Sequence, residues 1–118
     1  MNRVLLTPTF ERRFAHKRRK DPQNLVSLID TKVLELRHAD RPDLVGERKS
    51  SPLQGTLGIP LIRGTRLLYA VRSSGEGRLV ILLRVCSHKE TYSSLRAIEQ
   101  FYLRGDVTQV EQRLTARR

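Results

Sequence analysis

The strongest constraint on the fold is the apolar segment Leu79–Val85, which runs into a group of ionisable and aromatic residues. A short, nearly continuous apolar run is typical of a buried β-strand. Because strand side chains alternate between the two faces of a sheet, Arg84, Cys86 and His88 should share one face if the strand continues. An ammonium and a phenol follow within a few residues. These groups suit the binding of a phosphodiester and the transfer of a proton, so we predict an RNA-cleaving protein.

The segments before this strand predict a β-hairpin and two helices. Residues 66–71 form a second predicted strand, joined to the first by the glycine- and serine-rich loop 73–77. Residues 4–6 form a further short strand, and apolar residues at helical spacing predict two helices between residues 8 and 41. Each helix should begin at a capping residue followed by proline, Thr7-Pro8 and Asp21-Pro22.

The remaining segments predict an irregular region and a helical tail. Residues 43–58 hold glycines and a proline among polar residues, and we expect a short edge strand near 59–63. Two helices should follow the central strands, one that ends at Gly105 and one that is capped by Asp106.

This order of elements predicts an α+β fold. We expect a small antiparallel sheet with an N-terminal helical hairpin packed on one face and a C-terminal helix. A length of 118 residues fits one domain. We therefore assign residues 1–118 to a single domain, in which residues 106–118 form a C-terminal helical extension.

The charge balance indicates a polyanionic partner. Lys and Arg total 23 against 12 Asp and Glu, which gives a formal net charge of +11. Nucleic acid is the partner that we favour, with an acidic protein and an anionic membrane surface as alternatives. No apolar run approaches the ~20 residues that cross a bilayer, and the apolar stretch at residues 4–6 is too short for a signal peptide. With Cys86 as the only cysteine, we expect a cytoplasmic protein with no membrane partner.

The sequence does not predict a metal or a cofactor. His16, His38 and His88 are far apart, and no spacing typical of metal ligands surrounds them. The chain also lacks the common glycine-rich loops that bind phosphates. We therefore expect chemistry that uses side chains alone.

RNA can be cleaved in this way because its 2′-hydroxyl is a built-in nucleophile. His88 is the natural proton carrier, with an ordinary pKa near ~6.5, although an isolated histidine is more often structural. The planar fork of Arg66 can hold two phosphate oxygens. Arg84 interrupts an apolar strand, so it must reach solvent, a partner or a ligand. Tyr92 could stack on a base or contact the reacting phosphate.

The chain resembles the RelE/ParE superfamily of toxins from type II toxin–antitoxin pairs in three successive motifs, Pro52-Leu53-Gln54-Gly55, Gly64–Tyr69 and His88–Tyr92. The resemblance extends roughly from Val4 to Tyr92 and includes the helical hairpin. It implies a small twisted antiparallel sheet flanked by helices. It also implies, for the RNase branch, cleavage of mRNA in the ribosomal decoding site without a metal.

The resemblance also implies roles for individual residues. Arg66 matches the family arginine that contacts the phosphate, His88 the general acid of the YafQ-like branch, and Tyr92 the terminal aromatic of that motif. We predict these three as the catalytic residues. Four further residues are predicted to bind RNA or phosphate: Lys49, Arg63, Arg84 and Lys89. The general base stays open among Glu47, Lys49 and Glu90.

The partners implied are a cognate antitoxin, which wraps the basic surface of the toxin, and mRNA on the ribosome, with contacts to 16S rRNA. Oligomers are expected only through the antitoxin. One alternative is a ParE-like DNA gyrase poison without RNase activity, which the apolar segment 59–62 before Arg66 favours, because RelE-like members carry alternating basic residues there. A second alternative is a basic RNA-binding protein that is not catalytic.

Overall fold

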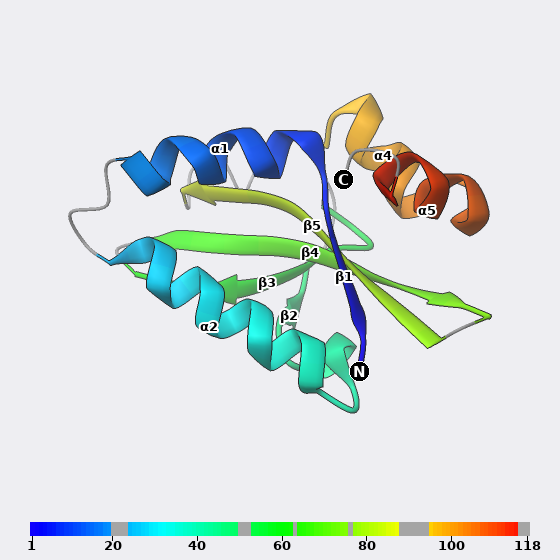
Figure 1. The fold of residues 1–118 in the computed structure, drawn as a ribbon, viewed down its shortest axis with the longest axis horizontal. Helices are drawn as coiled ribbons and strands as arrows, with labels where there is room; N and C mark the ends of the chain where they lie inside the picture. Colours follow the sequence, from blue (N-terminus) through cyan, green and yellow to red (C-terminus); the bar gives the residue numbers. More distant parts are fainter. Residues whose placement is uncertain (20–23, 50–52, 63, 76, 88–94, 116–118) are drawn as a thin grey trace.

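The structure is a computed structural model of the 118-residue chain. It describes residues 1–19, 24–49, 53–62, 64–75, 77–87 and 95–115. The strands are β1 (Arg3–Leu6), β2 (Glu47–Arg48), β3 (Leu57–Pro60), β4 (Thr65–Ser74) and β5 (Gly77–Ser87). The helices are α1 (Pro8–Arg19), α2 (Leu25–His38), the 3-10 turn η1 (Pro42–Leu44), α4 (Ala97–Arg104) and α5 (Val107–Thr115). The α+β fold is therefore confirmed (Figure 1).

The strands form one five-stranded sheet in the order β1-β5-β4-β3-β2. Strands β2 to β5 pair antiparallel, whereas β1 runs parallel to β5, with Val4 opposite Val80. The sheet is thus mixed, where the sequence predicted an antiparallel one. The reason is that β1 and β5 are far apart in the sequence, so no tight turn dictates their relative direction.

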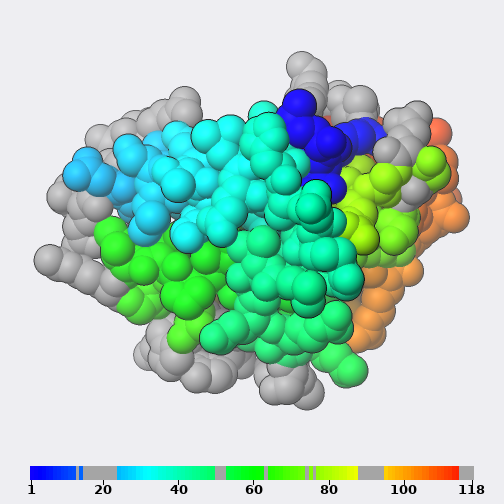
Figure 2. Space-filling model, turned by 90° about the horizontal axis from the view of Figure 1, so that it is seen from below, coloured from blue at the N-terminus to red at the C-terminus, as the bar shows by residue number. Residues whose placement is uncertain are grey.

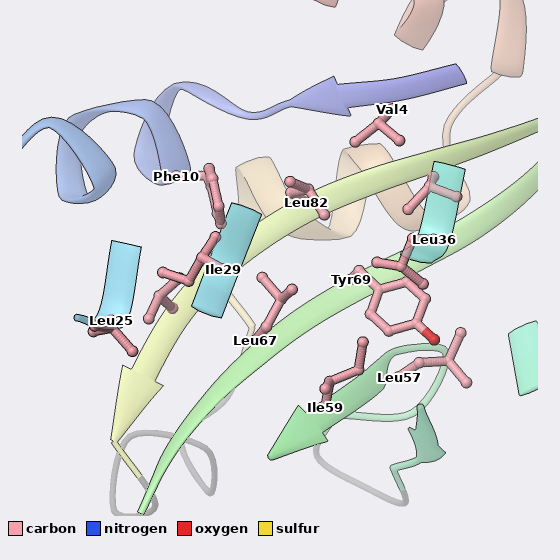
Figure 3. Packing of buried hydrophobic residues seen from close by; sticks show 12 residues of the cluster. Val4, Phe10, Leu25, Ile29, Leu36, Leu57, Ile59, Leu67, Tyr69 and Leu82 are labelled. Atoms are coloured by element: carbon pink, nitrogen blue, oxygen red, sulfur yellow. The ribbon is translucent and has the colours of Figure 1, made fainter. Parts of the chain in front are cut away.

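The helical hairpin α1–α2 covers one face of the sheet (Figure 1). The predicted start of α1 is confirmed, because the Phe10 N–H donates to the Thr7 hydroxyl at 3.2 Å and Pro8 is the first helical residue. The Asp21-Pro22 signal lies outside the described residues, and α2 begins at Leu25. Figure 3 shows side chains of both helices packed against β4 and β5. The buried residues of this hairpin-side core are Val4, Phe10, Leu25, Ile29, Leu36, Leu57, Ile59, Leu67, Tyr69, Val80, Leu82 and Val85.

Helices α4 and α5 lie on the opposite face (Figure 1). The predicted boundary at Gly105 is confirmed, and Asp106 caps α5 by accepting a hydrogen bond from the Gln109 N–H at 3.2 Å. Val110 and Leu114 of α5 are buried in the core on this side. The full set of buried residues in this α4-side core is Leu5, Leu53, Leu68, Ala70, Leu79, Ile81, Leu83, Cys86, Leu95, Tyr102, Val110 and Leu114.

A β-bulge in β5 determines where Arg84 points. Leu68 and Tyr69 are adjacent in β4, but they pair with Arg84 and Leu82, so Leu83 is the extra residue. Leu82 packs in the hairpin-side core, and strict alternation would send Arg84 to the same side. The bulge instead places Arg84 on the α4 side together with Cys86. The predicted shared face of these two residues is therefore confirmed.

Candidate nucleic-acid interface

Arg66 lies at the end of the sheet where β5 finishes. It is the second residue of β4 and pairs with Cys86, while Thr65 pairs with Ser87, the last residue of β5. Directly opposed residues of an antiparallel pair point to the same face, so Arg66 shares the α4 side with Cys86. Its side chain is half-buried. The sequence continues from Ser87 directly into His88.

Lys49 comes to the same face from the other edge of the sheet. It follows β2, and its backbone N–H donates to the Thr56 carbonyl at 3.1 Å. Thr56 in turn donates its hydroxyl to the Leu53 carbonyl at 2.8 Å, which closes the turn that contains Gly55. These hydrogen bonds fix the backbone at Lys49, and the Lys49 side chain lies over Gly58 of β3.

A polar pocket of about 320 Å³ opens beside Lys49. It lies between the turn at residues 53–56 and the segment that leads from η1 into β2. Its lining is Asp43, Arg48, Lys49, Gln54, Gly55, Thr56, Leu57 and Val71. The segment that contributes Asp43 and Arg48 follows α2, and the two together form much of the surface in Figure 2.

Arg84 has a carboxylate partner inside the protein. Its Nε donates to Glu99 Oε2 at 2.6 Å, and its Nη2 contacts Glu99 Oε1. Arg84 is 8% exposed and Glu99 only 2%. Glu99 also accepts a hydrogen bond from the Arg96 N–H at 2.9 Å, which caps α4. A buried arginine held by two bonds to one carboxylate is an anchor, so we leave Arg84 out of the phosphate-binding set proposed below.

The other predicted site residues, Arg63, His88, Lys89 and Tyr92, lie outside the described residues, as does Glu90. Their roles therefore stay predictions. Of the two remaining candidates for the general base, Glu47 is exposed in β2, opposite Gly58. Across the described ranges, no three His, Cys, Asp or Glu residues come together as a metal site. No helix in the same ranges is long and apolar enough to cross a membrane.

Two polar residues that hold α4 in place carry no recognisable signal in the sequence. Glu99 is one of them. The other is Arg72 of β4, which donates to the carbonyls of Tyr102 at 3.0 Å, Leu103 at 2.6 Å and Gly105 at 2.9 Å. Arg72 thereby satisfies carbonyl groups at the end of α4 that have no partner within the helix. The helix is thus attached to β5 at its start and to β4 at its end.

A buried tyrosine holds the segment that leads to β2. The Tyr69 hydroxyl donates to the Pro42 carbonyl at 2.7 Å and accepts from the Gly46 N–H at 2.8 Å. Burial raises the pKa of Tyr69 to about 12, because the interior disfavours the phenolate. The same residue thus belongs to the hairpin-side core and fixes the backbone that precedes Lys49.

Comparison with known proteins identifies the fold. No protein-family model matches the chain, and neither does any curated protein. Solved structures do match. A YoeB/ParE toxin from Agrobacterium tumefaciens is 16% identical, with 73% of this chain and 98% of that one covered and a TM-score of 0.61. A copper-bound mutant toxin from Helicobacter pylori is 21% identical, with 76% and 98% covered and a TM-score of 0.60.

A third match is a chain of the YoeB-YefM complex from Staphylococcus aureus, at 13% identity, with 75% and 98% covered and a TM-score of 0.56. At these identities the likeness establishes the fold. The chain has the fold of these solved structures, which confirms the fold that the resemblance in the sequence implied. The three toxins are covered almost completely, so roughly a quarter of the present chain has no counterpart in them.

Proposed function

We propose that this protein is the toxin of a type II toxin–antitoxin pair and acts as a metal-independent endoribonuclease on ribosome-bound mRNA. The register between β4 and β5 is the main support. It sets Arg66 opposite Cys86, two residues before His88 in the sequence, at the end of the central strand. Lys49 reaches the same face. A phosphate-binding cation therefore lies at the end of the strand from which the sequence continues to the proposed proton donor, His88.

The proposed reaction transfers the phosphoryl group within the RNA. A general base removes the proton of the 2′-hydroxyl, the 2′-oxygen forms a bond to phosphorus, and the bond from phosphorus to the 5′-oxygen breaks. The His88 imidazolium gives its proton to that leaving oxygen. The products are a 2′,3′-cyclic phosphate and a free 5′-hydroxyl. Arg66 and Lys49 stabilise the added negative charge on phosphorus, and Tyr92 holds a neighbouring nucleotide.

The proposed partners follow from the same reading. We infer a cognate antitoxin, since one of the similar structures is a YoeB-YefM complex. The net charge of +11 favours rRNA and mRNA contacts on the ribosome. We place the protein in the cytoplasm, where these partners meet, and expect it to oligomerise only through the antitoxin.

The second candidate function is a gyrase poison, because one fold can support both activities. The apolar segment 59–62 before Arg66 favours it. The stretch His88–Tyr92 favours the nuclease, since a binding poison needs no proton donor there.

Mapping of transcript 5′ ends separates the two functions. Purified protein is added to a translation extract with a defined message, and a parallel reaction contains gyrase and supercoiled DNA. The nuclease should yield new 5′-hydroxyl ends within codons, and His88→Ala should lower their rate of formation by orders of magnitude. Intact message together with gyrase-dependent DNA breaks would instead select the poison. Intact message with unimpaired translation and no DNA breaks would contradict both toxin activities.

A further inference from the structure

We propose that Gly58 is a positioning residue. Because glycine has no side chain, the Lys49 side chain can cross β3 toward Arg66. Lys49 and Arg66 then bind one RNA phosphate together. The inference builds on the proposed function for the identity of the ligand. The contact between Gly58 and Lys49 is a property of the structure itself.

The face toward which position 58 points follows from its neighbours. Leu57 and Ile59 pack in the hairpin-side core, so position 58 points to the α4 side. Its partner in β4 is Leu68, which belongs to the α4-side core. Gly58 is buried, and in place of a side chain of its own it has the stem of Lys49 above it.

The atom closest to the space above Gly58 belongs to the Lys49 side chain. A Cβ atom at position 58 would lie 2.6 Å from Lys49 Cε and 3.4 Å from its Nζ, and a separation below 3.0 Å does not occur in real structures. The next neighbour, Leu68 Cδ2, is at 3.4 Å. A methyl group at this position therefore displaces the end of a flexible lysine and leaves the packed core almost untouched.

Arg66 lies across β3 from Lys49, on the adjacent strand β4. It pairs with Pro60, so it is the diagonal neighbour of Gly58, about 7–8 Å away between Cα atoms. In the described part of the chain, no carboxylate lies within ion-pair distance of the Lys49 ammonium. Arg84, on the same face, is already neutralised by Glu99. An ammonium and a guanidinium, from Lys49 and Arg66, therefore lie on one face of neighbouring strands, an arrangement that suits a phosphate that bridges them.

Alanine at position 58 should not harm the fold. The described glycines that need a positive φ are Gly55, Gly64 and Gly77, and Gly58 is not among them. Alanine also leaves the unfolded chain less conformational entropy than glycine does, so less entropy is lost when the strand forms. A loss of RNA binding in Gly58→Ala would therefore come from Lys49 and not from unfolding.

A double-mutant cycle tests the proposal, with Gly58→Ala, Lys49→Ala and the double variant. The matched control is Gly75→Ala, because a Cβ atom added at Gly75 would meet no other atom within 4 Å. Each full-length protein is titrated with a short labelled single-stranded RNA over a range of salt concentrations. Thermal unfolding is measured in parallel.

Lys49→Ala should weaken binding about tenfold and lower the slope of log K against log salt by about 0.7, as expected for one lost phosphate contact. Gly58→Ala should reproduce most of both changes without a fall in melting temperature. The double variant should bind no worse than Lys49→Ala. Gly75→Ala should match the wild type.

Gly58→Ala with wild-type affinity would overturn the inference, and so would losses that multiply in the double variant. Wild-type protein without salt-dependent RNA binding would overturn it as well. If the proposed function fails but this inference holds, the double-mutant cycle will still show coupled losses of RNA binding, while the wild-type protein leaves ribosome-bound message uncleaved.

Discussion

The ion pair between Arg84 and Glu99 should be the most sensitive polar contact in the fold. We predict that Glu99→Ala lowers the free energy of unfolding by about 3–5 kcal/mol, the usual cost of removing one partner from a buried pair. The structure supports a value in this range because Arg84 is 8% exposed and would be left buried without its carboxylate. The Arg96 N–H at the start of α4 would also lose its acceptor.

Urea denaturation measures this loss. With a slope of about 1–3 kcal/mol per M for a small domain, the midpoint should fall by roughly 2 M. Glu99→Gln should lose less, because the amide can still accept hydrogen bonds from Arg84 and Arg96. The double variant Arg84→Met with Glu99→Leu should recover most of the stability, since replacing both charges leaves no buried ion.

The matched control is Glu35→Ala, which removes an exposed glutamate that contacts Lys32 at 3.3 Å. This variant should change stability by less than about 1 kcal/mol. A loss of under about 1 kcal/mol for Glu99→Ala would refute the reasoning, because it would mean that water reaches Arg84 without cost. A double variant as unstable as Glu99→Ala alone would refute the claim that the uncompensated charge is the cause.

Three further predictions concern the site and the core. Arg66→Ala should lower mRNA cleavage by roughly 10²-fold, while Arg12→Ala, a matched charge loss at an exposed position of α1, should cleave normally when 5′ ends are counted. His88→Ala should lower the single-turnover cleavage rate by roughly 10²–10⁴-fold, and a variant with full activity would remove His88 from the mechanism. Tyr69, with a pKa raised to about 12, should contribute stability that is complete below pH ~10 and lost as the pH rises toward 12, by roughly 2–3 kcal/mol. Tyr69→Phe should remove that alkaline step from the unfolding curves, and an unchanged step would assign it to other groups.

Signals that act within a few residues predicted much of the fold. The start of α1 at Thr7-Pro8 and the start of α5 at Asp106 depend on side chains that bond to the next turn of the same helix. The long hairpin of β4 and β5 depends on its loop and on two apolar runs. These contacts are local, so the sequence alone reveals them.

Pairings between segments that are far apart in the sequence were not predicted by these local signals. The parallel pairing of β1 with β5 joins segments more than 70 residues apart, such as Val4 and Val80. The two-residue strand β2 is too short to show an alternating sequence pattern, and it forms because it pairs with the edge of β3. The bulge at Leu83 is likewise invisible in an apolar run, yet it decides which face receives Arg84.

In the candidate site, too, local features were predicted from the sequence and long-range contacts were not. The sequence establishes that a charge within the apolar strand needs a partner, and it names Arg84 correctly as such a charge. It cannot show that the partner is Glu99, fifteen residues later on α4, because helix packing brings the two together. The placement of the Lys49 side chain over Gly58 depends equally on the register of β2, β3 and β4.

The net charge of +11 includes cations that are engaged in contacts within the protein, so it overstates how many cations can contact RNA. Three arginines from three different strands hold the C-terminal helices: Arg3 contacts Glu111 of α5, Arg72 donates to carbonyls at the end of α4, and Arg84 pairs with Glu99. These contacts bind the positive charge within the protein. The cations proposed to contact RNA lie on the same sheet face, with Arg66 opposite Cys86 near the end of β5 and the Lys49 side chain over Gly58 of β3. Because counterion release counts phosphate contacts and not net charge, the salt dependence of RNA binding should reflect this smaller set.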